Sequence, residues 1–158
     1  MIIGNLVFLS MISINQIKRL REETGVSVSE CKKALEEAKG DFEKSKDVLR
    51  KWGRDLAGKK AERKACLGIV DSYIHPDKRI GAIIELRCET DFVAKSDDFK
   101  SLAHELCLQI AAMDPEDNSL MFCPWIKDET KTIKDLIDEY ISKLGENIIV
   151  KRFTRYEI

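Results

Sequence analysis

The chain has 158 residues, 44% of them hydrophobic and 35% charged, which suits one globular domain with a small appendage. The net charge of −1 conceals an asymmetry along the chain. Residues 15–65 hold 15 Lys/Arg against 10 Asp/Glu, whereas residues 66–126 hold 5 against 11. A generic nucleic-acid-binding protein is usually basic overall, so we expect no direct nucleic-acid partner.

The five cysteines are widely spaced and form no Cys-x-x-Cys pair, which argues against both a disulfide scaffold and a zinc site. The two histidines, His75 and His104, are too few and too scattered to complete a metal cluster. We therefore predict reduced, mostly buried thiols in the cytoplasm and no bound cofactor.

Residues 1–14 are apolar and contain no Lys or Arg, so they lack the positive start of a secretory signal. They are also too few to cross a bilayer, and no membrane association is expected. Met11 precedes Ser13 and resembles a more natural start. We interpret residues 1–14 as an extension without function, whose first ten residues can arise from an upstream mis-start.

Residues 15–53 predict three short helices joined by tight turns. The first covers about residues 16–23 and stops at Gly25, and Ser27 with Glu30 fits a capping box for the second. Gly40 ends the second helix and Asp41 caps the third. Such bundles are docking modules more often than catalysts, because their surfaces lack deep clefts. The third helix should bury Phe42, Ser45, Leu49 and Trp52.

Residues 54–65 are rich in Lys and Arg around a few apolar positions and predict a charged linker helix. Two interpretations remain for this segment: a solvated connection between two domains, or a contact surface for RNA. The pattern favours the solvated connection.

Residues 66–158 predict an α+β core. Residues 68–74 and 80–88 form a hairpin around a turn of about five residues, and residues 147–156 supply a third antiparallel strand. An amphipathic helix over 97–113 and a second one between Thr132 and Gly145 should cover one face of this sheet. Residues 120–125 read as a short apolar connection.

Enzymatic activity is not expected. The chain contains no nucleophile elbow, no phosphate-binding glycine loop and no local Cys/His pair. Its carboxylates fall on faces predicted to be solvated.

The segment Thr90-Asp91-Phe92-Val93 follows a buried strand and precedes a helix. Asp91 could cap the following helix while Phe92 anchors the core. Alternatively, both side chains are presented to another molecule. Spacing alone favours the first interpretation.

Two long stretches resemble signatures of bacterial elongation factor Ts. Residues 20–35, with the sequence LREETGVSVSECKKAL, are similar to the N-terminal signature of that family, and residues 85–95 are similar to the second. Residues 73–75 and 143–153 resemble the family in the same order. The resemblance covers nearly the whole chain after residue 14.

The resemblance implies a guanine-nucleotide exchange factor for elongation factor Tu, which would bind Tu with GDP and without nucleotide. It implies a UBA-like N-terminal bundle that docks through Val26, Val28 and Ser29. It also implies that Asp91 and Phe92, flanked by Thr90 and Val93, enter Tu near its magnesium and nucleotide site and favour GDP release. A rival from another class is an adaptor that binds Tu or another protein without exchanging nucleotide.

The chain departs from the family pattern at several positions. Ser29 replaces a larger apolar residue, Arg87 stands where Asn is usual, and Asp77-Lys78 replace turn glycines. The connection between Met113 and Trp125 is short where longer members carry a second core subdomain. Because short members tend to pair, a homodimer is predicted.

Overall fold

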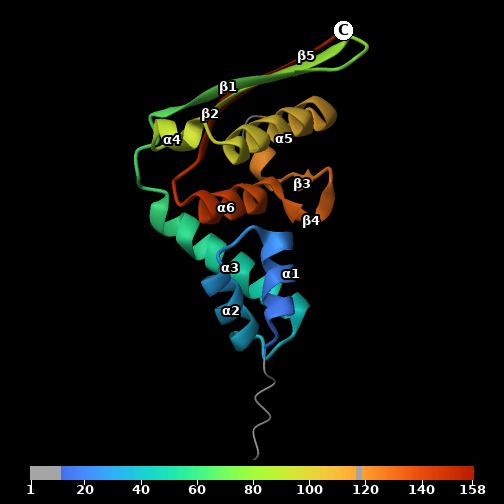
Figure 1. The fold of residues 1–158 in the computed structure, drawn as a ribbon. Helices are drawn as coiled ribbons and strands as arrows, with labels where there is room; N and C mark the ends of the chain where they lie inside the picture. The colour runs from blue at the N-terminus through green and yellow to red at the C-terminus, as the bar shows by residue number, and fades with distance from the viewer. Residues whose placement is uncertain (1–11, 117–118) are drawn as a thin grey trace, which may run out of the picture. The chain divides into compact units, whose positions relative to one another are not determined.

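The computed structural model describes residues 12–116 and 119–158 of the chain (Figure 1). The chain divides into two compact units, Met1–Trp52 and Gly53–Ile158. The expectation for residues 1–10 lies outside the described residues. The finer division into residues 15–53, 54–65 and 66–158 stays a prediction.

The first unit contains the predicted helices. Helix α1 (Ile14–Thr24) begins with a capping box at Ser13, and it ends where Gly25 adopts a left-handed φ of 68°. Helix α2 (Val28–Glu37) is capped by Ser27, whose side chain accepts a hydrogen bond from the Glu30 N–H. The core of this unit consists of the buried residues Leu20, Cys31, Ala34, Leu35 and Leu49, and the predicted residues Phe42 and Trp52 pack against it.

Helix α3 (Phe42–Lys60) contains both the third predicted helix and most of the segment expected as a separate linker. The second half of α3 belongs to the second unit and is bound to it. Arg54 forms an ion pair with Asp135 at 2.7 Å, and the Lys60 ammonium donates to the Gly145 carbonyl. Residues 54–60 thus continue α3 without a break and contact the second unit.

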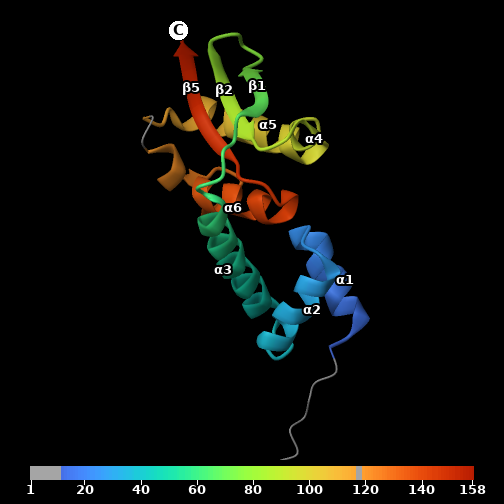
Figure 2. The same ribbon diagram turned by 90° about the vertical axis from the view of Figure 1, so that its left-hand side faces the viewer.

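The second unit is built on a three-stranded antiparallel sheet with the order β1-β2-β5 (Figure 2). Strands β1 (Leu67–Ile74) and β2 (Ile80–Cys88) form the predicted hairpin, and β5 (Ile149–Glu157) pairs with β2. The hairpin turn contains Lys78 with a φ of 64°, so one residue still adopts the left-handed conformation that glycine favours.

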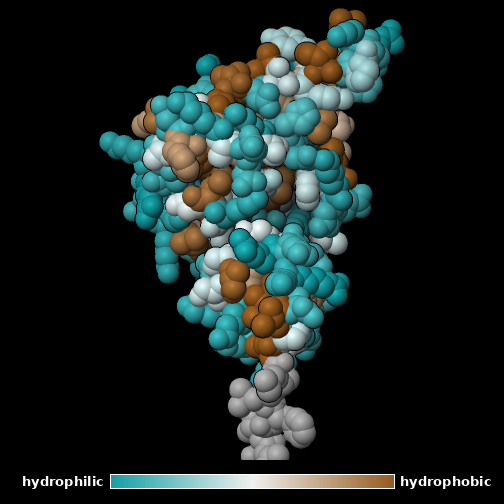
Figure 3. All heavy atoms as spheres, in the orientation of Figure 1, coloured by the Kyte–Doolittle hydropathy of each residue, from teal (hydrophilic) through white to brown (hydrophobic). Residues whose placement is uncertain are grey.

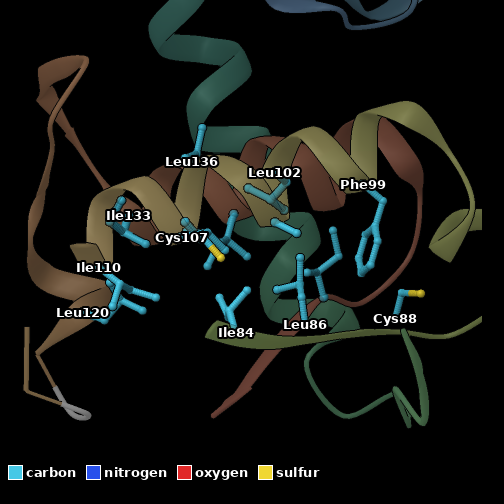
Figure 4. Close-up of a cluster of buried hydrophobic side chains, with 14 of the residues drawn as sticks. Ile84, Leu86, Cys88, Phe99, Leu102, Cys107, Ile110, Leu120, Ile133 and Leu136 are labelled. Atoms are coloured by element: carbon cyan, nitrogen blue, oxygen red, sulfur yellow. The ribbon is translucent and has the colours of Figure 1, made fainter. Parts of the chain in front are cut away.

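One face of the sheet is covered by the short helix α4 (Asp91–Ala94) and by α5 (Asp97–Met113), as Figure 1 shows. Helix α6 (Ile133–Leu144) packs against α5 and contributes to the same hydrophobic core. In Figure 4, side chains of α5 point toward Ile84 and Leu86 of β2. The buried face of α5 confirms the predicted amphipathic helix, and only its last residue, Met113, is an apolar side chain 47% exposed.

Residues 120–132 contain structure that the sequence did not predict. A 3-10 turn (Leu120–Phe122) leads into a two-stranded hairpin of β3 (Pro124–Trp125) and β4 (Asp128–Thr132). The buried Gln109 side chain holds this hairpin, because its amide donates to the Pro124 carbonyl and accepts from the Ile126 N–H, both at 2.9 Å.

Candidate functional site

Residues 90–93 form the start of the short helix α4. Thr90 is its N-cap, and the Thr90 hydroxyl oxygen accepts a hydrogen bond from the Val93 N–H at 3.3 Å. Ser96 caps the next helix by accepting from the Phe99 N–H at 3.3 Å. Both caps are thus supplied by hydroxyl residues, and the interpretation of Asp91 as a cap is wrong.

The four predicted site residues divide into an exposed and a buried set. Phe92 is 86% exposed, and Thr90 and Asp91 are also exposed. Val93 is only 5% exposed and belongs to the core of the second unit. The interpretation of Phe92 as a core anchor is therefore wrong, and Val93 takes that role. The structure brings a carboxylate and an aromatic ring to the surface on a short element whose other side is packed.

An exposed phenylalanine contributes little to folding. Burying a phenylalanine side chain stabilises a protein by roughly 1.5–3 kcal/mol relative to leaving it exposed, and Phe92 does not gain this. Single exposed apolar residues are ordinary on protein surfaces. The combination at Phe92 is less ordinary, since its backbone is capped at both ends while its ring remains unpacked.

Three side chains hold the backbone around residues 90–93. The buried Cys88 thiol donates to the Thr90 carbonyl at 3.2 Å, and the Ser96 hydroxyl donates to the Val93 carbonyl at 2.7 Å. Burial raises the pKa of the Cys88 thiol to about 11, so this thiol stays protonated and can donate at neutral pH. The third is Glu146, whose carboxylate accepts from the Glu89 and Thr90 backbone. Sequence reasoning did not identify Glu146 as part of the site.

The predicted docking turn lies in the first unit, at the start of α2. Val28 is 50% exposed and Ser29 is exposed. Val26 is half-buried and packs against the core of the bundle. Val28 and Ser29 are thus available to a partner, whereas Val26 mainly supports the turn.

The outer face of the sheet carries exposed apolar side chains. Alternation along β2 directs Ile83 and Glu85 outward. Ile83 lies between Ser72 of β1 and Thr154 of β5, and Glu85 lies between Val70 and Arg152 of the same two strands. Figure 3 shows apolar side chains, coloured brown, at the end of the second unit where the sheet lies. Val70, Ile83 and Tyr156 are 70%, 44% and 67% exposed and line one hollow in this face.

Arg87 belongs to an ion-pair cluster on the same face. Its guanidinium lies 2.6 Å from one oxygen of Glu85, and that of Arg152 lies 2.6 Å from the other. Hydrogen bonds from Arg87 and then Arg152 lower the pKa of Glu85 below its ordinary value. The departure from Asn at position 87 therefore supplies one of the two cations that neutralise Glu85.

The basic segment near residues 54–64 is largely engaged within the second unit. Besides the contacts of Arg54 and Lys60, the Arg63 guanidinium lies 3.8 Å from Glu89. These contacts favour a structural role for the segment over an RNA surface.

Within residues 12–116 and 119–158, no group of three His, Cys, Asp or Glu side chains is placed to hold a metal ion. Over the same residues, every helix is too short or too polar to cross a membrane.

The chain was compared with known proteins. A family model described as elongation factor TS matches residues 89–158. Elongation factor Ts of Thermotoga maritima is 42% identical over 191 residues, covering 93% of this chain and 96% of the relative. Elongation factor Ts of Moorella thermoacetica is 40% identical over 194 residues, covering 94% and 96%. Since these alignments exceed 158 residues, the relatives contain residues that this chain lacks.

Similarity at this level over nearly the full length of both chains establishes the family. The chain belongs to the elongation factor Ts family of translation elongation factors.

Proposed function

We propose that this protein binds elongation factor Tu in the cytoplasm and promotes GDP release from it, without covalent chemistry and without a cofactor. The observation that carries the proposal is Phe92, an aromatic ring 86% exposed at the start of a capped and anchored helix. In the proposed complex, Asp91 and Phe92 enter Tu near its magnesium and nucleotide site. Thr90 and Val93 hold them in place, while Val26, Val28 and Ser29 form the docking turn.

The chemistry of the magnesium site explains how an inserted ring can release GDP. Magnesium requires nearly ideal octahedral geometry and is held by a few protein oxygens, phosphate and water. A side chain that displaces one element of Tu by a small distance therefore weakens both metal and nucleotide. The effect is reciprocal. If this protein lowers the affinity of Tu for GDP by some factor, GDP lowers the affinity of Tu for this protein by the same factor.

The proposal is tested by the release of fluorescent GDP from Tu. We expect wild-type protein to accelerate release and Phe92→Ala to lose most of the acceleration. Phe122→Ala is the matched control, because Phe122 is a 76% exposed phenylalanine in the same unit but outside residues 90–93. This control should retain wild-type exchange.

The rival function is an adaptor that binds Tu without exchanging nucleotide. It predicts a complex with Tu but no acceleration of GDP release by the wild-type protein. An equal effect of Phe92→Ala and Phe122→Ala would leave exchange standing but remove the assignment of Phe92.

We also propose that two copies pair through the outer face of the sheet. The exposed apolar side chains Val70, Ile83 and Tyr156 on this face suit burial against an identical face. Sedimentation equilibrium should give a dimer for the wild type and a monomer for Val70→Asp. The Phe122→Ala control should remain a dimer, and a monomeric wild type would contradict the pairing.

A further inference from the structure

The turn between α6 and β5, residues 145–147, is joined by side-chain hydrogen bonds to the turn that precedes α4. Glu146 Oε2 accepts from the Glu89 N–H at 3.0 Å and from the Thr90 N–H at 2.9 Å. Its other oxygen accepts from the Thr90 hydroxyl at 2.6 Å. One carboxylate thus receives three hydrogen bonds from two consecutive residues, and short bonds to a charged acceptor are the strong ones.

A hydrogen bond in the opposite direction also joins the two turns. The Asn147 N–H donates to the Glu89 carboxylate at 2.7 Å, so each turn supplies one carboxylate to the backbone of the other. The Asn147 side chain, which is 3% exposed, donates to the carbonyl of Arg63 at 2.8 Å. This ties the paired turns to the segment that follows α3 within the second unit.

Glu146 also sets the orientation of the Thr90 hydroxyl. A hydroxyl has one proton and two lone pairs, and here the proton is directed to Glu146. The lone pairs are then free to accept from the Val93 N–H, which is the cap of α4. Because α4 has only four residues, it cannot be stable by its own hydrogen bonds and depends on this cap and on tertiary contacts.

We propose that Glu146 is a positioning residue for nucleotide exchange, holding the backbone of residues 89–93 so that Phe92 is presented in one orientation. Glu146 itself need not touch Tu. The inference rests on the proposed exchange function. It adds Glu146, 54 positions after Phe92 in the chain, to the residues that determine the rate of GDP release.

The decisive experiment measures fluorescent-GDP release from Tu over a range of factor concentrations. We expect Glu146→Ala to lower the maximal release rate roughly tenfold or more, because a misplaced group near a reacting centre is costly. The half-saturating concentration should change little, because the docking turn lies in the other unit. Glu105→Gln is the control: Glu105 pairs with Lys127 in the same unit and contacts no group of residues 89–93, so its rate should stay at wild type.

A double-mutant cycle separates positioning from general stability. If Glu146 acts through Phe92, adding Glu146→Ala to Phe92→Ala should slow exchange no further, whereas an independent effect would multiply. Full multiplication of the two effects, or wild-type exchange by Glu146→Ala, would overturn the inference. If Phe92→Ala exchanges as the wild type does, the proposed site fails instead, and the two failures are thereby distinguished.

A second pair of variants applies if Glu146→Ala does not fold. Thr90→Ser keeps the hydroxyl that joins Glu146 to the Val93 N–H, and Thr90→Val removes it at nearly constant shape. We expect the maximal rate of Thr90→Val to fall clearly below that of Thr90→Ser, because only the serine variant keeps the hydroxyl. Equal rates for both variants would contradict the role of the Glu146 contact.

Discussion

Phe92 and Phe99 lie seven residues apart, each in the first turn of a capped helix, yet their environments are opposite. Phe99 is fully buried between α5 and β2, where Figure 4 shows it near Leu86 and Cys88, whereas Phe92 is 86% exposed. In α4 the inward positions are occupied by Val93 and Ala94. In a helix of four residues, the position of a side chain around the helix axis decides whether it is buried, and its hydrophobicity does not.

The same division runs along β2. Ile84 points into the core and is fully buried, whereas Ile83 points outward and is 44% exposed. Since successive residues of a strand point to opposite faces, the apolar run over residues 80–86 supplies a core and an exposed apolar surface together.

The largest expected effect is at the buried member of the phenylalanine pair. Phe99→Ala removes a fully buried ring and should lower the free energy of unfolding by about 3–5 kcal/mol. Urea denaturation followed by circular dichroism measures this. A loss below about 1 kcal/mol would mean that the site collapses around the smaller side chain.

Val93→Ala tests whether residue 93 anchors α4. The side chain is 5% exposed, and loss of its two methyl groups should lower the free energy of unfolding by about 1–2 kcal/mol. The same denaturation experiment applies. An unchanged free energy of unfolding would contradict the role of Val93 as the buried anchor of α4.

Phe92→Ala should change the free energy of unfolding by less than about 0.5 kcal/mol, as exposed substitutions usually do. Combined with the GDP-release experiment, this sharpens the comparison, because a variant that loses exchange and keeps its stability has lost a contact with Tu. A marked destabilisation would show that Phe92 packs within the protein.

The smallest effect is on the outer face of the sheet and is seen in its titration. Arg87→Asn removes the larger cause of the lowered pKa of Glu85, which should rise toward 4.5 when followed by NMR. Since the folded pKa lies below its unfolded value, Glu85 stabilises the fold above pH 4.5, and this contribution is lost as the pH falls through the folded pKa. The variant should show less of this acid destabilisation; an unchanged pKa would assign the shift to Arg152.

Much of the fold could be predicted because its signals are local. The period of α5, the capping residues Ser27 and Thr132, and the left-handed glycines at 25 and 145 each depend on neighbours within a few residues. The hairpin β3-β4 was missed because it is very short and depends on Gln109, an ordinary polar residue within an amphipathic helix.

The sequence by itself determined the long helices, the three main strands and the resemblance to the family, because period, caps and signature residues are written in consecutive positions. It also identified residues 90–93 as the candidate site. Only the tertiary structure showed that Thr90, and not Asp91, caps α4 and that Phe92 is exposed. It also showed that Glu146 accepts hydrogen bonds from this segment. The Glu146 contacts join groups more than 50 residues apart, and hydrogen bonds of that kind leave no periodic signal in a single chain.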